Sequence, residues 1–124
     1  RSMQELVEVK AYLAEKPGAV AEYPFGPTAL VYKVGGKMFA LVSEDEWPLR
    51  INLKCDPALA LAQRDMYTAV LPGYHMNKRH WNTVVLDGSV PAAEVRAMMD
   101  DSYALVVKGL GKAVREQLRL SADD

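Results

Sequence analysis

The sequence predicts an α+β fold in which helices pack on one face of a curved antiparallel sheet. The expected elements follow the order helix, strands, helix, hairpin, helix, and two of the strands flank a two-glycine turn. A third strand alternates apolar and polar residues, which is typical of a half-buried strand. Single cores typically organise about 100–150 residues, so the 124 residues fit one domain. We expect this domain to span residues 3–120, followed by a disordered tail over residues 121–124.

The first part of the chain supplies a helix and a hairpin. Apolar residues at helical spacing predict a helix over residues 3–16, and a short strand is expected over residues 19–23. The clearest local signal is Gly35-Gly36, a turn that tolerates positive φ and joins strands over residues 30–34 and 37–41. Because both strands are apolar on both faces near their centres, we expect this hairpin to lie inside the sheet.

A regular hairpin would pair Tyr32 with Phe39 and Leu30 with Leu41 on one face of the sheet. The alternating strand is expected over residues 49–55. A helix is then expected from Asp56-Pro57 to Met66, because aspartate caps a first turn and proline fits its first position.

The second part of the chain supplies a further strand and the longest helix. After a polar loop, the strand is expected over residues 81–86. Pro91 begins the last long helix, which the polar group at residues 100–102 is expected to kink or restart. Residues 112–120 are expected to add a further turn or two.

The charge of the chain is nearly balanced but unevenly distributed. Fifteen Lys and Arg against sixteen Asp and Glu give a net charge of −1. Strongly basic nucleic-acid-binding domains, in contrast, commonly exceed a pI of about 9. Residues 58–82 hold three bases and one acid, a local charge of +2, and residues 83–124 hold five bases and seven acids, or −2.

Composition excludes several classes of protein. Cys55 is the only cysteine, which excludes an internal disulfide and a Cys-rich metal site, and we expect it to face the core. No apolar run approaches the ~20 residues of a membrane-spanning helix. No basic stretch followed by an apolar segment opens the chain. We therefore expect a soluble, cytoplasmic protein with no membrane partner.

No segment matches a strong catalytic or metal-binding motif. His75 and His80 with Cys55 fall short of the four ligands of a structural zinc site. Paired acidic residues are interpreted as capping or solvated groups. We expect no catalytic residue, no metal, no cofactor and no enzyme activity. An enzyme in which His75 or His80 donates a proton beside Tyr74 is an alternative, although nothing in the sequence orients such a group.

The densest cluster of polar and aromatic side chains lies over residues 72–83. As a basic finger, it would set Lys78 and Arg79 against phosphates and stack Tyr74 on a base. As a plain connection, it would be a solvated loop between two strands. Both interpretations remain open from the residues alone.

A second candidate surface is the polar side of the alternating strand. It presents two bases and an amide at alternate positions, namely Arg50, Asn52 and Lys54. These side chains project together and would receive an anionic ligand or an acidic partner. Lys33 and Lys37, near the tip of the glycine hairpin, would extend this surface. The alternative is the ordinary solvated side of an amphipathic strand.

Three stretches in the same order resemble the MmcQ/YjbR family of small bacterial proteins. They are residues 31–40 (VYKVGGKMFA), residues 53–57 (LKCDP) and residues 72–84 (PGYHMNKRHWNTV). Ser102-Tyr103 followed by LVV agrees as well, and the resemblance runs from about residue 5 to residue 120. This match covers nearly the whole chain.

The resemblance implies a CyaY-like, or frataxin-like, α+β sandwich and DNA binding through a double-wing arrangement. Carried over position by position, the implied DNA-binding residues are Lys33, Lys37, Lys54, His75, Asn77, Lys78, Arg79 and Asn82. With ~4–5 phosphate contacts, binding would be weak and would fall steeply with salt.

The sequence therefore predicts a small, non-enzymatic DNA-binding protein, with a monomer as the favoured state. The alternative is a small-molecule or protein-interaction module that uses Arg50, Asn52 and Lys54 and has no role with nucleic acid. A frataxin-like fold also raises metal binding by acidic residues of the first helix, which are Glu5, Glu8 and Glu15.

Overall fold

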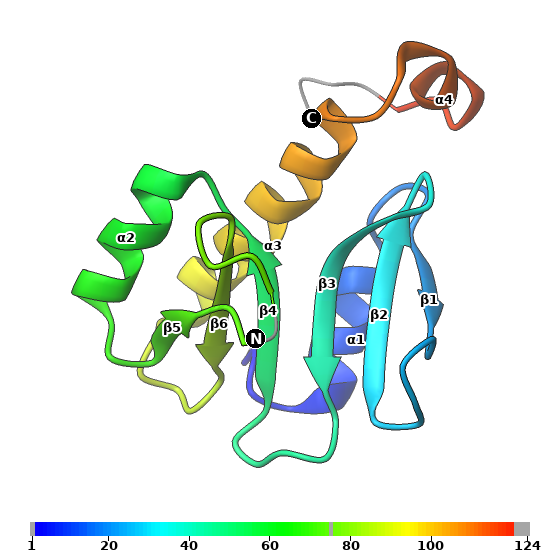
Figure 1. The fold of residues 1–124 in the computed structure, drawn as a ribbon. Helices are drawn as coiled ribbons and strands as arrows, with labels where there is room; N and C mark the ends of the chain where they lie inside the picture. Colours follow the sequence, from blue (N-terminus) through cyan, green and yellow to red (C-terminus); the bar gives the residue numbers. More distant parts are fainter. Residues whose placement is uncertain (1, 75, 121–124) are drawn as a thin grey trace.

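The computed structural model describes residues 2–74 and 76–120, which form one six-stranded antiparallel sheet and four helices (Figure 1). In chain order the elements are α1 (Leu6–Ala14), β1 (Val20–Glu22), β2 (Ala29–Val34), β3 (Lys37–Ser43), β4 (Arg50–Lys54), α2 (Pro57–Met66), β5 (Val70–Pro72), β6 (Trp81–Val85), α3 (Ala92–Lys108) and α4 (Lys112–Gln117). The strands lie in the order β1-β2-β3-β4-β6-β5. The predicted α+β class is confirmed, and the expected tail over residues 121–124 lies outside the described residues.

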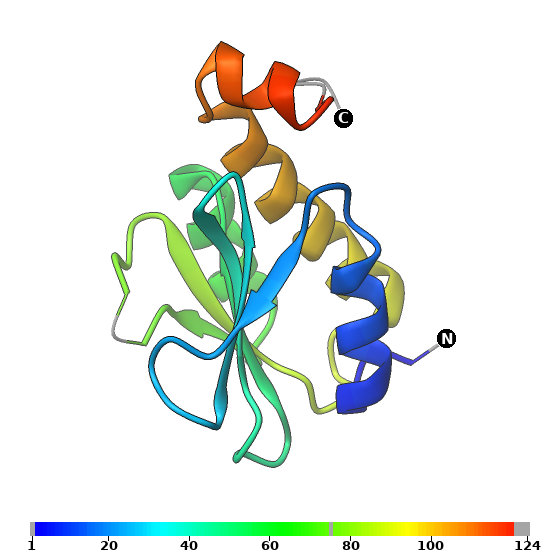
Figure 2. The same ribbon diagram turned by 90° about the vertical axis from the view of Figure 1, so that its right-hand side faces the viewer.

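The helices that contact the sheet pack on one face and leave the other open (Figure 2). α3 crosses β3 and β4, and α2 packs against β5 and β6. α1 lies beside α3, and its Lys10 carbonyl accepts a hydrogen bond from the Tyr32 hydroxyl of β2 at 3.4 Å. The prediction of helices on one face of an antiparallel sheet is therefore confirmed.

The core lies between the sheet and α3. The Phe39 ring packs edge-on against Tyr103 of α3, with ring centroids 5.2 Å apart. Ser102, fully buried on the same helix, donates to the Phe39 carbonyl at 2.6 Å and accepts from the Lys54 backbone N–H at 2.9 Å. One hydroxyl thus joins α3 to β3 and to the end of β4, and it satisfies two backbone groups that would otherwise be buried without partners.

The glycine hairpin departs from the predicted register at a β-bulge. Val34 pairs with Lys37 and Lys33 with Met38, but Tyr32 then pairs with Ala40, so Phe39 is an extra residue. In a bulge of this kind two residues of one strand oppose one residue of the partner. The predicted pairs Tyr32–Phe39 and Leu30–Leu41 are therefore wrong.

The bulge changes which residues face the core. Phe39, Ala40 and Val42 are fully buried in the core, whereas Leu41 lies on the open face opposite Asn52 of β4. This matters for the site because Leu41 becomes part of its floor.

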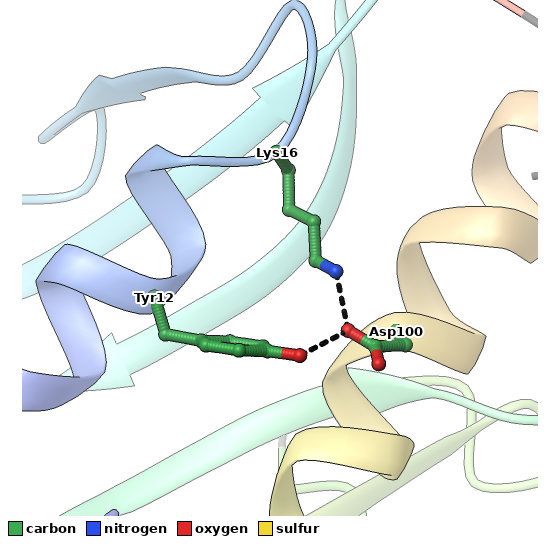
Figure 3. A network of polar contacts seen from close by, with 3 residues as sticks. All are labelled: Tyr12, Lys16 and Asp100. Atoms are coloured by element: carbon green, nitrogen blue, oxygen red, sulfur yellow. Dashed lines mark hydrogen bonds and ion pairs between the residues drawn. The ribbon is translucent and has the colours of Figure 1, made fainter. Parts of the chain in front are cut away.

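α3 is continuous, so the predicted kink or restart at residues 100–102 is wrong. Asp100 instead faces α1, where its Oδ1 accepts hydrogen bonds from the Tyr12 hydroxyl at 2.7 Å and from the Lys16 ammonium group (Figure 3). The Lys16 ammonium also lies 4.9 Å from the centre of the Tyr12 ring. Burial, and then the hydrogen bond to Asp100, raise the pKa of the Tyr12 hydroxyl to about 12. This network fastens α1 to α3.

The other expected elements are present with small changes at their ends. The Asp56 carboxylate accepts from the backbone N–H groups of Ala58 and Leu59, which confirms the predicted cap of α2. Cys55 is buried, as expected, and that burial raises the pKa of its thiol to about 11. In the part of the chain that the structure describes, no helix is long and apolar enough to cross a membrane.

Candidate functional site

Two hairpins reach the same end of the sheet. β2 runs toward the turn at Gly35-Gly36, and β5 runs toward the loop at residues 73–80. β4 lies between these hairpins and ends at Lys54, on the same side, because each neighbouring pair of strands is antiparallel. The topology thus places three segments that are far apart in the sequence at one end of the sheet, with the two hairpin tips on either side of β4 (Figure 1).

The glycine turn is packed against the C-terminal helices. Gly35 has a φ of +58°, and a Cβ atom there would lie 2.7 Å from a Leu110 methyl group. Val114 of α4 is the next neighbour, so α4 lies over this turn (Figures 1 and 2). α4 also carries two basic residues, Lys112 and Arg115. Lys112 Nζ lies 4.0 Å from Glu116 Oε1, and Arg115 Nη1 donates to the Leu110 carbonyl at 2.6 Å.

Among the predicted DNA-binding residues that the structure describes, Lys33 has its charge paired within the sheet. Its Nζ lies 2.6 Å from Glu22 Oε1 on the neighbouring strand β1. An ion pair of this kind reduces the field that Lys33 presents to a ligand, because the carboxylate cancels much of its charge at a distance.

The loop at residues 73–80 is held by Arg64 of α2. Arg64 Nε donates to Asn82 Oδ1 at 2.7 Å, and its Nη2 donates to the backbone carbonyls of Lys78 and Trp81. One planar guanidinium thus joins a helix, a strand and a loop, as its fork of donors allows. In the sequence Arg64 is recognisable only as part of the local positive charge, because its positioning role depends on contacts that the sequence does not reveal.

Within the loop, local hydrogen bonds arrange the basic residues. Asn77 Oδ1 accepts from the Arg79 backbone N–H at 3.0 Å, and the His80 carbonyl accepts from the Cys55 backbone N–H at 2.8 Å. The Lys78 and Arg79 side chains are exposed. Asn77 therefore shapes the loop, and Lys78 and Arg79 are accessible to a ligand. The predicted contact at His75 lies outside the described residues.

Asn82 requires a correction. Its exposed fraction is 1%, and its Nδ2 donates to the Ala60 carbonyl and to Gln63 Oε1, both at 3.3 Å. With its Oδ1 bound to Arg64, the amide is fully engaged. A direct contact with DNA is incompatible with this placement, so Asn82 is a positioning residue that joins β6 to α2.

The polar side of β4 lies on the open face, as predicted, but it is less exposed than expected. Asn52 is 8% exposed, and its Oδ1 accepts a hydrogen bond from the Thr83 hydroxyl of β6. Arg50 is half-buried, with its Nε 3.7 Å from Glu46 Oε1. Lys54 is also half-buried at the end of the strand.

The open face contains a hollow of about 730 Å³. Its walls and floor are formed by Phe25, Ala29, Met38, Leu41, Ser43, Asp45, Glu46, Arg50, Asn52, Tyr74, Met76 and Thr83. Arg50 and Asn52 of the second predicted surface belong to it, whereas Lys54 does not. Sequence reasoning missed the apolar members because they come from four separate strands and loops.

Charge is segregated along the strands. We call the end with the two hairpin tips the basic end, and define it by Lys37, Lys54, Lys78, Arg79, Lys112 and Arg115. The acidic residues Asp56, after β4, and Glu116, in α4, lie at the same end, so the bases outnumber the acids there without excluding them. The opposite end holds the β3–β4 connection, which carries Glu44, Asp45 and Glu46, and the β6–α3 connection, which carries Asp87. A net charge of −1 thus conceals a basic end and an acidic end.

Nothing in the described chain gathers the ligands of a metal centre. Across residues 2–74 and 76–120, no three His, Cys, Asp or Glu side chains lie close enough to hold a metal ion. The acidic residues of the first helix, raised by the frataxin-like resemblance, therefore form no such group within this range.

Comparison with known proteins finds relatives over almost the whole chain. The chain is 42% identical to the uncharacterized protein YbdF of Escherichia coli O157:H7 over 117 residues, covering 94% of this chain and 96% of YbdF. It is 37% identical to the uncharacterized protein YjbR of Escherichia coli K12 over 111 residues, covering 90% of this chain and 94% of YjbR.

Solved structures and a family model also match this chain. The crystal structure of Deinococcus radiodurans DR2400, a DUF419 domain, superposes with a TM-score of 0.92 at 39% identity, covering 97% of this chain and 91% of that one. A Pseudomonas syringae protein superposes with a TM-score of 0.72 at 27% identity, covering 82% of this chain and 98% of that one. The YjbR family model matches residues 14–105. The chain belongs to the YjbR family.

Proposed function

We propose that the protein binds DNA through the basic end, without catalysis, as a cytoplasmic monomer. The observation that carries the proposal is the segregation of charge in a chain whose net charge is only −1. A polyanion responds to the local field of a surface, so a basic end can attract it although the whole molecule is nearly neutral.

The two hairpins would act as the two wings of a CyaY-like, double-wing arrangement. Lys78 and Arg79 would meet phosphates from one wing and Lys37 from the other, with Lys54 between them. Lys33 would contribute less because Glu22 pairs with it. About four phosphate contacts correspond to a slope of about −3.6 in log affinity against log salt on duplex DNA.

The test is duplex binding measured by fluorescence anisotropy between about 50 mM and about 200 mM salt. The double variant Lys78→Ala with Arg79→Ala should reduce the magnitude of the salt slope by about 2, because each lost phosphate contact releases about one counterion fewer. The control is Lys10→Ala, which removes an exposed charge from α1 behind the sheet and should leave the slope unchanged. An unchanged slope in the double variant would remove the loop from the site, and no binding by the wild type to duplex or to single-stranded DNA would reject the function.

A second candidate function rests on the hollow. It contains Arg50 and Asn52, which are two of the three residues of the second predicted surface. A small-molecule or protein-interaction module would use these donors for an anionic ligand. Its test is the thermal stabilisation of wild type and Arg50→Ala by a panel of small carboxylates and phosphates, where equal shifts in both proteins would count against it.

A further inference from the structure

The hollow on the open face combines features that a purely electrostatic duplex site does not need. It holds about 730 Å³ and adjoins the basic end, because Tyr74 lies both in its wall and in the loop that carries Lys78 and Arg79. A surface that contacts only phosphates requires cations at its rim, and an apolar hollow beside them would add nothing to that binding.

Two exposed aromatic rings line the hollow. Tyr74 is 69% exposed and Phe25 is 71% exposed, and each comes from a different hairpin or loop. Met38 and Met76 lie in the same lining. Exposed aromatic faces beside a basic groove are the surfaces on which proteins stack the bases of a single strand, since every base has a π-face.

The floor of the hollow presents an oriented hydrogen-bond donor. The Thr83 hydroxyl accepts from the Tyr74 backbone N–H at 3.1 Å and donates to Asn52 Oδ1. Because the hydroxyl has one proton and gives it to Asn52, the Asn52 amide is held with its oxygen toward Thr83. Its Nδ2 is then the group left to donate to a carbonyl on the edge of an unpaired base.

The acidic residues at the far rim of the hollow limit where the phosphate backbone of a bound strand can lie. Asp45 and Glu46 line the hollow at the end opposite the basic loop. Phosphates would be repelled there, whereas carboxylates accept hydrogen bonds from the amino groups of bases. A strand would therefore keep its phosphates on the basic end and turn its bases toward the hollow.

We propose that the hollow binds unpaired bases of single-stranded DNA, so that the protein prefers single strands to duplexes. This inference rests on the proposed DNA binding and deepens it. In a duplex the bases are stacked and paired inside the helix, so they cannot enter the hollow, whereas the bases of a single strand are free to stack on Tyr74 and Phe25.

The experiment compares three fluorescent ligands of equal length, about 16 nucleotides, chosen to span one binding site. They are an oligothymidylate, the same backbone with abasic residues, and a mixed-sequence duplex. Wild type should bind the oligothymidylate about 10-fold or more tightly than the abasic strand, because stacking contributes only when bases are present. It should also bind the oligothymidylate more tightly than the duplex.

Tyr74→Ala should weaken oligothymidylate binding by about 10- to 100-fold and leave duplex and abasic binding unchanged. Tyr74→Phe should restore wild-type binding, since the ring does the stacking. The matched control is Trp47→Ala, which removes an aromatic ring that is equally exposed, at 71%, but lies outside the hollow.

The outcomes separate the two proposals. Salt-sensitive duplex binding with no preference for the oligothymidylate, or an oligothymidylate affinity that Tyr74→Ala leaves unchanged, would overturn the base-binding hollow and retain the proposed DNA binding. No binding to any of the three ligands would overturn both.

Discussion

The two hairpins lie at the same end of the sheet, yet they are built in opposite ways. The β2–β3 hairpin has a two-residue turn whose Gly35 is packed against Leu110, so its tip is fixed by the C-terminal helices. The β5–β6 hairpin has a long loop, residues 73–80, which side-chain hydrogen bonds from Arg64 hold in place. The first hairpin therefore serves mainly as a support with one exposed lysine, and the second presents the accessible basic residues.

The packed turn gives the largest expected effect. Gly35→Ala should destabilise the protein by about 2–5 kcal/mol, because it adds left-handed backbone strain to a steric overlap in a packed region. The overlap would be with Leu110, 2.7 Å from the new Cβ. Gly36→Ala is the control: its φ is +78° but no atom lies within 4 Å of the added Cβ, so only the strain remains. If urea unfolding shows that Gly35→Ala and Gly36→Ala lose equal free energy of unfolding, the turn is not packed by the helices.

Substitutions at the asparagines that hold the loop at residues 73–80 are expected to have the next largest effect on stability. Asn82→Ala should cost about 1–3 kcal/mol, since it leaves buried partners without hydrogen bonds. The same variant should weaken the proposed DNA binding through the loop, because Arg64 loses one of the three acceptors that hold it. Asn77→Ala removes one exposed hydrogen bond to Arg79 and should cost less than about 1 kcal/mol. Chemical unfolding measures the free energy of unfolding of both variants. A larger loss of stability for Asn77→Ala than for Asn82→Ala would contradict the roles assigned to these two residues.

The third test concerns Ser102 of α3, whose hydroxyl joins β3 to the end of β4, the strand between the hairpins. Ser102→Ala leaves the Phe39 carbonyl and the Lys54 N–H without their partner, at a cost of about 1–3 kcal/mol. Amide exchange at Lys54 should become faster, whereas exchange in the 73–80 loop should not change. As a control, Ser89→Ala alters an exposed turn and should stay within about 0.5 kcal/mol of wild type.

The contact between α1 and α3 touches neither hairpin and gives the smallest effect, limited to high pH. The Tyr12 pKa is raised in the folded chain from its ordinary value of 10.0 to about 12. The stability that the protonated hydroxyl contributes is therefore complete below pH 10 and is lost as the pH rises toward about 12. Tyr12→Phe should have a flatter stability profile over this range, measured by thermal unfolding. A profile identical to that of wild type would show that Tyr12 does not contribute.

The order of elements could be predicted from the sequence because their signals are local. The glycine turn and the Asp56 cap each depend on neighbouring residues, and both are where the pattern placed them. The bulge could not be predicted, since Phe39 leaves the regular register to pack against Tyr103 of a distant helix.

The candidate site could be predicted only in part from the sequence, because it also depends on contacts between residues that are far apart in the chain. Lys78 and Arg79 are exposed, as a polar loop indicates. Asn82 has the same polar character but is buried by Arg64, which lies 18 residues earlier on a helix. The α4 contact with the glycine turn depends equally on distant packing. Local pattern shows which side chains are polar, and tertiary contacts decide which of them face solvent.

The bulge at Phe39 also bears on how sequences of this kind can be compared. Because Phe39 is the unpaired residue of the bulge, its removal would leave Ala40 opposite Tyr32 and Leu41 opposite Val31. Leu41 would then stay in the floor of the hollow, whereas the ring that packs against Tyr103 would be lost. A one-residue gap at this point in a related chain would therefore mark the loss of a core contact between β3 and α3, while the register of the rest of β3 and the floor of the hollow would be unchanged.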